Sequence, residues 1–166
     1  MAAICLSSEL KDMILSDGQI LELVEKEQLI SEGFHKDNLT PNGYDVTIKE
    51  VSVLGWRPES HGTAVIPKKT WFAISTEEYF RFPSYLVGEI WIRTTWARNG
   101  VVPSFGMIDA GFEGNLTLSA YNTCKEIEVP IGETFAQIVF HRLSRDADKK
   151  YSERSGNYQG QRGVKL

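Results

Sequence analysis

The chain carries the stretch GMIDAGFEGNL at residues 106–116, where one aspartate, Asp109, stands among apolar residues and three glycines. Apolar runs on both sides of a glycine-rich centre predict a strand, a turn and a returning strand that continues as LTLSAYNT. A carboxylate buried in such a hairpin is costly unless it is paired or used, and glycines at this density indicate that the backbone closely approaches another group. The stretch therefore predicts a β-hairpin that presents Asp109 to a ligand.

Short runs rich in β-forming residues surround this hairpin from Asp45 to Leu143, and Gly, Pro and Asn turns separate them. Runs that recur about every 8–15 residues without intervening helices favour a sandwich, barrel or jelly roll over a parallel α/β sheet. The sequence therefore predicts an all-β fold. We expect a single domain over residues 1–166, because a chain of this length can bury one core and not two.

Two segments of different character flank the predicted β body. The only clear helical period runs over Ser16–Ile30, and Ser16 followed by Gln19 fits a capping box, which predicts a short helix within an N-terminal segment, 1–35. From residue 144 the chain becomes polar and rich in glycine and charge. We expect residues 144–166 to form a mobile C-terminal lid that folds over an anionic ligand.

Composition excludes several classes of protein. Eighteen Lys and Arg against 22 Asp and Glu leave a net charge of -4, which gives no electrostatic basis for binding a nucleic-acid polymer or an anionic membrane. Cys5 and Cys124 lack CxxC spacing, and His35, His61 and His141 are scattered, so neither disulfides nor a zinc site are expected. The N-terminal residues do not resemble a signal peptide and no window approaches ~18 apolar residues, so we expect a cytoplasmic protein.

The segment RTTWARNG, residues 93–100, carries residue types that bind phosphate. Arg93 and Arg98 are five residues apart, and the hydroxyls of Thr94 and Thr95 lie between them. Two guanidinium groups so spaced can bracket a polyphosphate, because each can bind two oxygens at once. The alternative is a short solvated turn after a strand.

Two further polar residues stand in β-rich surroundings. Asp45 enters a strand in NGYDV, residues 42–46, where an aspartate is more often a turn former than a ligand. Gln137 lies among apolar neighbours in IGETFAQIVF, residues 131–140, and could either bind a ligand or cap a neighbouring backbone group.

The chain resembles the superfamily of dCTP deaminases and trimeric dUTPases in the order and spacing of NGYDV, RTTWARNG, GMIDAGFEGNLTLSAYN and IGETFAQIVF, followed by a Tyr/Gln/Gly tail. The hairpin is the most specific segment, since dUTPases carry a similar Gly-x-Ile-Asp hairpin and deaminases a similar Ile-Asp-x-Gly-aromatic-x-Gly. RTTWARNG is similar to the deaminases' Arg-Ser-Ser-x-Ala-Arg. The resemblance implies a distorted jelly roll of the dUTPase-like β-clip type, assembled as a homotrimer whose active sites lie between subunits and are closed by the tail.

The two branches of this superfamily differ on the returning strand of the hairpin. Deaminases carry a Glu there, which moves protons between the attacking water and the departing ammonia without zinc, and this chain has Ser119. The spacing from Asp109 to a following Tyr-Asn pair is that of the family, which supports the alignment. Loss of such a base removes ~10²–10⁴ in rate, so deamination is disfavoured. Glu113 and Glu126 are the possible stand-ins, although both fall at predicted turns.

Because Ser119 stands where deaminases carry a Glu, the resemblance implies a dUTP diphosphatase, which hydrolyses dUTP to dUMP and pyrophosphate. Such an enzyme limits uracil in DNA and supplies dUMP for dTMP synthesis. Its cofactor would be Mg²⁺, and Asp109 would be the base that activates water. Asp45 is a weaker candidate for an outer-sphere Mg²⁺ contact. The implied phosphate-binding residues are Arg93, Thr94, Thr95, Arg98, Gln137, Tyr158 and Gln161. The implied nucleoside-binding residues are Phe112, Asn115, Leu116, Thr117 and Leu118.

The tail departs from both branches. It lacks the Phe that stacks on uracil in dUTPases, and Asn157 replaces a lysine that deaminases carry before the second tyrosine, so triphosphate binding could rest on Arg154 or Arg162. A dCTP deaminase, or a bifunctional deaminase and dUTPase, is the alternative. A non-catalytic nucleotide-binding homologue is the third possibility, but it has little use for a carboxylate that repels phosphates.

Overall fold

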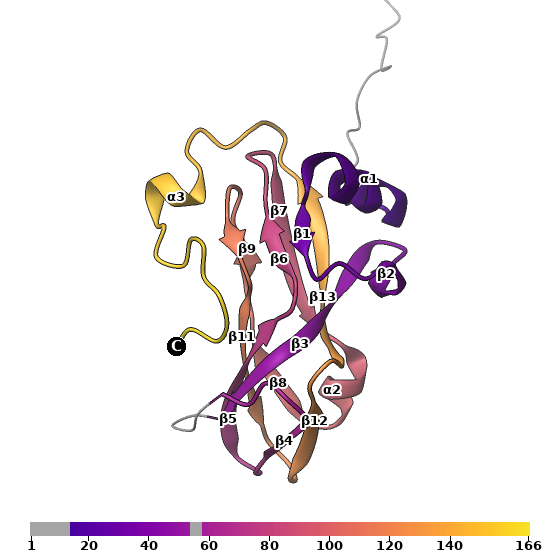
Figure 1. Cartoon of the computed structure of the whole chain (residues 1–166), viewed down its shortest axis with the longest axis vertical. Helices are drawn as coiled ribbons and strands as arrows, with labels where there is room; N and C mark the ends of the chain where they lie inside the picture. The colour runs from indigo at the N-terminus through magenta and orange to yellow at the C-terminus, as the bar shows by residue number, and fades with distance from the viewer. Residues whose placement is uncertain (1–13, 54–57) are drawn as a thin grey trace, which may run out of the picture.

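Antiparallel strands form the body of the protein in the computed structural model, which describes residues 14–53 and 58–166 (Figure 1). Part of the predicted segment 1–35, including Cys5, lies outside the described residues. The largest sheet has the order β8-β11-β5-β3-β13-β7-β9, with β2 paired to β3. Its strands are β2 (Leu39–Thr40), β3 (Gly43–Val53), β5 (Thr70–Thr76), β7 (Leu86–Ile92), β8 (Val101–Ser104), β9 (Met107–Ile108), β11 (Thr117–Asn122) and β13 (Thr134–Arg142).

Within the described ranges, two smaller antiparallel sheets complete the β body and four short helices lie outside it. One sheet has the order β1-β6-β10, from β1 (Ile30–Glu32), β6 (Tyr79–Arg81) and β10 (Glu113–Gly114). The other pairs β12 (Ile127–Pro130) with β4 (Thr63–Ile66). The helices are α1 (Asp17–Glu27), η1 (Lys36–Asn38), α2 (Thr94–Arg98) and α3 (Tyr151–Arg154). None of the described helices is long and apolar enough to cross a bilayer.

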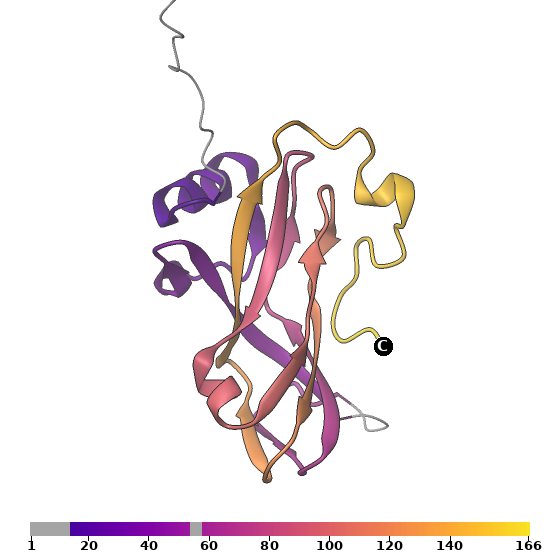
Figure 2. The same ribbon diagram turned by 180° about the vertical axis from the view of Figure 1, so that it is seen from behind.

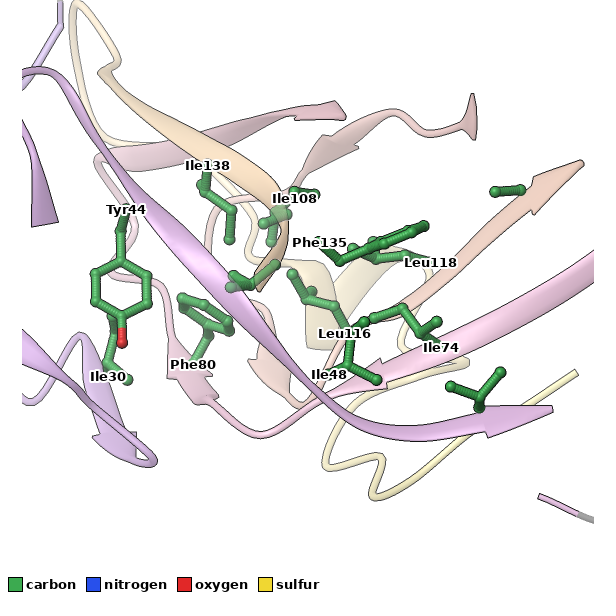
Figure 3. Packing of buried hydrophobic residues seen from close by; sticks show 14 of the residues in the cluster. Ile30, Tyr44, Ile48, Ile74, Phe80, Ile108, Leu116, Leu118, Phe135 and Ile138 are labelled. Carbon is green, nitrogen blue, oxygen red and sulfur yellow. The ribbon is translucent and has the colours of Figure 1, made fainter. Parts of the chain in front are cut away.

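Buried apolar side chains of the described residues form a core inside the curled sheets. Side chains from separate strands meet there, among them Ile48 of β3, Ile74 of β5 and Phe135 of β13 (Figure 3). Burying a side chain of this size stabilises the fold by about 1.5–3 kcal/mol. The ring of Phe135 also contacts Trp96 of α2 at 5.5 Å and Phe105 at 6.1 Å between centroids, so the same core residue positions α2 and the start of the loop that carries Asp109.

The predicted N-terminal helix forms, but it ends earlier than the sequence indicated. Its capping box is present, since the Ser16 N–H donates to Gln19 Oε1 at 2.9 Å. Helix α1 stops at Glu27 because Gln28 takes a left-handed conformation with φ 56°. Ile30 then pairs with Phe80 as part of β1, so burial in the sheet overrides the helical pattern over the last residues of Ser16–Ile30.

A buried carboxylate ties β3 to the turn between β5 and β6. Glu78 has no exposed surface, and its two carboxylate oxygens accept the Thr47 N–H at 3.0 and 3.1 Å, while Tyr44 Oη donates to Oε1 at 3.5 Å. Burial, the largest effect, raises the pKa of Glu78 from 4.5 to about 7, and the hydrogen bonds to the carboxylate oppose the rise. The folded protein therefore holds a proton here that the unfolded chain releases.

This difference makes the free energy of unfolding depend on pH. Between pH 4.5 and 7 the folded state binds more protons at Glu78 than the unfolded state does, so stability falls as the pH rises through this window. Glu78→Gln keeps a neutral acceptor for Thr47 and removes the ionisation. The free energy of unfolding is measured by chemical denaturation for both proteins. We expect the difference between the variant and the wild type to be about 3 kcal/mol more in favour of the variant at pH 8 than at pH 5.

The matched control is Glu126→Gln, which removes an exposed carboxylate and should keep the wild-type pH dependence. Equal pH dependence of the Glu78→Gln variant and the wild type would contradict the buried-proton account.

Candidate functional site

A cavity of about 580 Å³ lies between strand β11, the loop that carries Asp109 and the C-terminal tail. Thr117, Leu118 and Ser119 line it from β11, and Tyr158 lines it from the tail. A volume of several hundred cubic ångströms suits a ligand of nucleotide size. The cavity therefore brings together Asp109 and parts of both predicted groups of binding residues.

Asp109 points out of the fold, which corrects the expectation of a buried acid. Its neighbours Ile108 and Ala110 are 5% and 7% exposed, whereas Asp109 itself is exposed at the cavity. The Phe112 N–H donates to the Asp109 carbonyl oxygen at 3.1 Å and closes a turn. No group in the described part of the chain forms a hydrogen bond or ion pair with the Asp109 carboxylate. It is free to accept a proton from water or a hydrogen bond from a ligand.

The strands around Asp109 pair differently from a simple hairpin. Strand β9 pairs with β7 and β10 pairs with β6, so the two short strands on either side of the Asp109 turn do not pair with each other. The antiparallel partners are β8 and β11, and the residues between them form an excursion from the large sheet. The turn that carries Asp109 is thus anchored to β7 on one side and to β6 on the other.

The glycines of this segment accommodate the tail. Gly111 has φ +83°, and a Cβ at this position would lie 2.6 Å from Lys150 Cβ. Gly114 has φ +146°, and a Cβ there would lie 3.2 Å from the Gln161 backbone N. The sequence indicated that another group closely approaches these glycines, and we expected a ligand. The groups that approach them are residues 150 and 161 of the same chain.

The backbone groups expected to read the base are only partly available. The Asn115 N–H donates to the Gln161 carbonyl oxygen at 3.0 Å, and Gln161 Nε2 donates to the Asn115 carbonyl oxygen. The Leu116 N–H donates to Thr76 Oγ1 at 2.9 Å, and the Leu116 carbonyl oxygen accepts the Thr76 N–H at 3.0 Å. Asn115 and Leu116 therefore position the loop, and their own backbone groups are already bonded.

Thr117 and Leu118 keep one free strand edge. Strand β5 pairs along β11 from Thr117 onward, whereas β8 pairs with β11 only from Ser119 onward. Among the described strands, none pairs with Thr117 and Leu118 on the side away from β5. A flat ligand with donors and acceptors could bind this edge as a partner strand would.

The arginine-bearing segment forms a separate cluster, which we call the arginine cluster and which comprises Arg93, Thr94, Thr95, Arg98 and Gln137. Arg93 Nε pairs with Asp45 Oδ2 at 2.9 Å, and its Nη1 donates to Thr134 Oγ1. Gln137 Nε2 donates to Thr40 Oγ1 at 2.7 Å. Burial raises the pKa of the Asp45 carboxyl, and the Arg93 charge counteracts the rise. The Asp45 carboxylate is therefore engaged by Arg93, and its outer-sphere Mg²⁺ contact stays a prediction.

No residue of the arginine cluster lines the cavity that contains Asp109. Helix α2, which carries most of the cluster, and α3, which belongs to the tail, lie at opposite ends of the molecule in both views (Figures 1 and 2). Arg98 is exposed, and within the described ranges no side chain pairs with it. The predicted phosphate-binding residues thus fall into two groups, with Tyr158 and Gln161 in the cavity and the arginine cluster away from it.

The tail packs along the loop that carries Asp109. The Tyr151 N–H donates to the Ala110 carbonyl oxygen at 2.9 Å, and the Tyr151 ring contacts Phe112 edge-on at 5.5 Å between centroids. Tyr151 Oη accepts the Tyr158 N–H at 3.2 Å. Tyr151 therefore links the tail to the loop that carries Asp109. The mobility of residues 144–166 stays a prediction.

Arg162 is engaged by the body of the protein. Its guanidinium binds both carboxylate oxygens of Glu32, at 2.5 and 2.7 Å, and lies 4.2 Å from the centre of the Tyr79 ring. Hydrogen bonds from Arg162 lower the pKa of Glu32. Arg154 is exposed and does not line the cavity. Of the two cations expected to serve the triphosphate, neither faces the cavity. The tail cation that does so is Lys165, which no sequence pattern distinguished from its neighbours.

A cation would have few protein ligands here. The described residues contain no group of three His, Cys, Asp or Glu side chains that could hold a metal ion. Mg²⁺ commonly binds through one or two carboxylates, several waters and the phosphates of a substrate. The residues present therefore fit an Mg²⁺ ion that arrives with a triphosphate, and they do not fit a resident metal centre.

Sequence comparisons relate the chain to dCTP deaminases. The model of the dCTP deaminase-like family matches residues 55–143. The dCTP deaminase of Thermococcus gammatolerans is 40% identical over 158 residues, which cover 93% of this chain and 96% of that protein. A protein of Persephonella marina named "dCTP deaminase, dUMP-forming" is 30% identical over 173 residues, which cover 92% and 94%.

Solved structures share the fold. The 2'-deoxycytidine 5'-triphosphate deaminase of Agrobacterium tumefaciens superposes with a TM-score of 0.70 at 18% identity, covering 80% of this chain and 48% of that one. The dUTPase of Staphylococcus bacteriophage 80alpha superposes with a TM-score of 0.51 at 20% identity, covering 79% and 87%. These likenesses confirm the predicted dUTPase-like all-β fold.

Proposed function

Since the chain belongs to the dCTP deaminase family, we propose that its cavity binds a deoxyuridine triphosphate and that it hydrolyses dUTP to dUMP and pyrophosphate. The relatives are named for deamination of dCTP, and one is named as dUMP-forming. Release of dUMP from a triphosphate requires cleavage of the phosphate chain. The names of these relatives therefore include both deamination and phosphate-chain cleavage. The choice between them rests on the acids of the cavity.

One observation carries the choice. Asp109 carries the only side-chain carboxylate among the described residues that line the cavity. Ser119, which stands where deaminases carry a Glu, lines the same cavity between Ala73 and Ser104 of the neighbouring strands. The possible stand-ins Glu113 and Glu126 do not line it. A serine hydroxyl cannot move protons near neutral pH as a carboxylate does, so the cavity supports hydrolysis better than deamination.

The proposed mechanism gives each group one task. Asp109 accepts a proton from the water that attacks the α-phosphorus, and the bond between this phosphorus and the bridging oxygen breaks as pyrophosphate leaves. The free edge of Thr117 and Leu118 holds the base. Tyr158 and Gln161 close the cavity over the phosphates. When bound with the substrate, Mg²⁺ supplies charge stabilisation for the leaving pyrophosphate.

The arginine cluster takes part through a second copy of the chain. Arg98 is an unpaired exposed cation, yet it does not line the cavity of its own chain. Exposed apolar residues surround a groove of about 410 Å³ on the face of β7 and β8, including Trp91 at 58% and Met107 at 53% exposure. An apolar surface of this kind suits contact between copies. We infer a homotrimer in which the arginine cluster of one subunit completes the cavity of the next.

The test is to incubate the protein with Mg²⁺ and either dUTP or dCTP and to separate the products. We expect dUMP and pyrophosphate from dUTP, and neither ammonia nor uridine nucleotides from dCTP. Ammonia released together with loss of dCTP would contradict the proposal and establish a deaminase. Absence of products from both nucleotides, with binding retained, would favour the non-catalytic homologue.

A further inference from the structure

The cavity has an unusual balance of charge for a site that binds a triphosphate. Among the described residues that line it, Asp109 has the only acidic side chain and Lys165 has the only side chain that is positively charged near neutral pH. Asp109 repels phosphate groups, and the arginine cluster lies outside the cavity of its own chain. Lys165 is therefore the cationic side chain through which a single subunit can attract a triphosphate into this cavity.

Three contacts hold Lys165 in place. Its backbone N–H donates to Thr117 Oγ1 at 3.1 Å, which anchors it beside the proposed nucleoside edge. Its ammonium Nζ donates to the Asn157 carbonyl oxygen at 3.1 Å and lies 5.4 Å from the centre of the Tyr158 ring. No carboxylate within the described ranges forms an ion pair with Lys165. An ammonium group has three donors, so most of its hydrogen-bonding capacity is available to a ligand.

The preceding residues explain why Lys165 faces the cavity. Arg162 is fixed to Glu32, and the Val164 N–H donates to Glu50 Oε2 at 3.1 Å. Between them Gly163 adopts φ +68°, and a Cβ there would lie 2.9 Å from the Glu50 carboxylate. These contacts attach the tail to the body on one side, and the chain then turns so that Lys165 reaches β11. A solvated lysine at a loose chain end would lack such supports.

We propose that Lys165 is a binding residue for the phosphate chain of the substrate. When the nucleotide enters, the Lys165 ammonium donates to a β- or γ-phosphate oxygen and keeps its contact with the Tyr158 ring. The inference rests on the proposed function in one respect, namely that the ligand is a deoxynucleoside triphosphate. It does not depend on whether the base is uracil or cytosine.

The experiment compares the binding of three ligands to Lys165→Gln and the wild type by calorimetry without turnover. The ligands are dUTP with an α,β-imido bridge, dCTP with the same bridge, and dUMP. We expect Lys165→Gln to weaken both triphosphate analogues by about tenfold or more and to leave dUMP unchanged, because a charge-assisted hydrogen bond to the outer phosphates is lost. Lys165→Arg should retain most of the affinity.

The matched control is Lys149→Gln, which removes the same charge from an exposed tail position that does not line the cavity. Its affinities should equal those of the wild type. Equal weakening of dUMP and the triphosphates by Lys165→Gln, or no weakening at all, would overturn the proposal. A failure of the proposed function would look different. If the wild type binds the triphosphates but leaves dUTP intact, only the proposal of dUTP hydrolysis is refuted. A wild type that binds neither triphosphate refutes both.

Discussion

Replacing Asp109 with asparagine is expected to lower the turnover of dUTP by ~10²–10⁴-fold, the usual cost of removing a general base. The amide has nearly the same shape as the carboxylate but cannot accept a proton from water. Because Asp109 is exposed and no described group pairs with it, the substitution should leave the thermal unfolding temperature unchanged. The rate is measured by pyrophosphate release.

Nucleotide binding separates this catalytic role from a structural one. The affinity of Asp109→Asn for the α,β-imido analogue of dUTP should equal or exceed that of the wild type, since one negative charge near the phosphates is gone. Ser119→Ala serves as the control in the same cavity, and its hydrolysis of dUTP should stay close to normal. Near-normal turnover by Asp109→Asn would remove the base from the mechanism.

A second large effect is expected when two inactive variants are combined in one oligomer. Asp109→Asn lacks the base, and Arg98→Ala lacks a cation of the arginine cluster. If each site takes its cavity from one subunit and its arginine cluster from the next, co-expression in equal amounts restores sites in which both groups are intact. Random mixing in a cyclic trimer gives about a quarter of the wild-type activity.

Arg98 is the suitable partner for this experiment because it is exposed and unpaired, whereas removal of Arg93 would leave the mostly buried Asp45 without its ion pair. Each variant expressed alone sets the background. Recovery must depend on mixed assembly, so subunits with different tags are purified in two steps. Mixed oligomers that stay as inactive as the single variants would show that the two groups do not serve one site.

Much of the fold could be predicted from the sequence because local patterns determine it. The β-rich runs and their turns predicted the antiparallel body, and the Ser16 and Gln19 side chains marked the start of α1. The end of α1 could not be predicted in the same way. Ile30 continues the helical spacing, but its burial against Phe80 gains more than another helical turn would, and only the assembled sheet reveals that competition.

Prediction of the site was limited by contacts between distant parts of the chain. Apolar neighbours suggested that Asp109 is buried, but successive residues at a turn point in different directions, and only Ile108 and Ala110 enter the core. The glycines indicated a close approach without identifying the approaching group, which is the tail. Lys165 carries no local pattern, and its position follows from contacts of Arg162 and Val164 with the body.

If Arg93 binds the phosphates as proposed, its pairing with Asp45 bears on how the site distinguishes substrate from product. Asp45 is mostly buried, so drawing the guanidinium away from it leaves a partly desolvated carboxylate without its counterion, at a free-energy cost. A ligand with four negative charges offsets that cost, and one with two offsets much less of it. The competition between Asp45 and the ligand for one cation would therefore favour departure of the monophosphate and keep product inhibition weak.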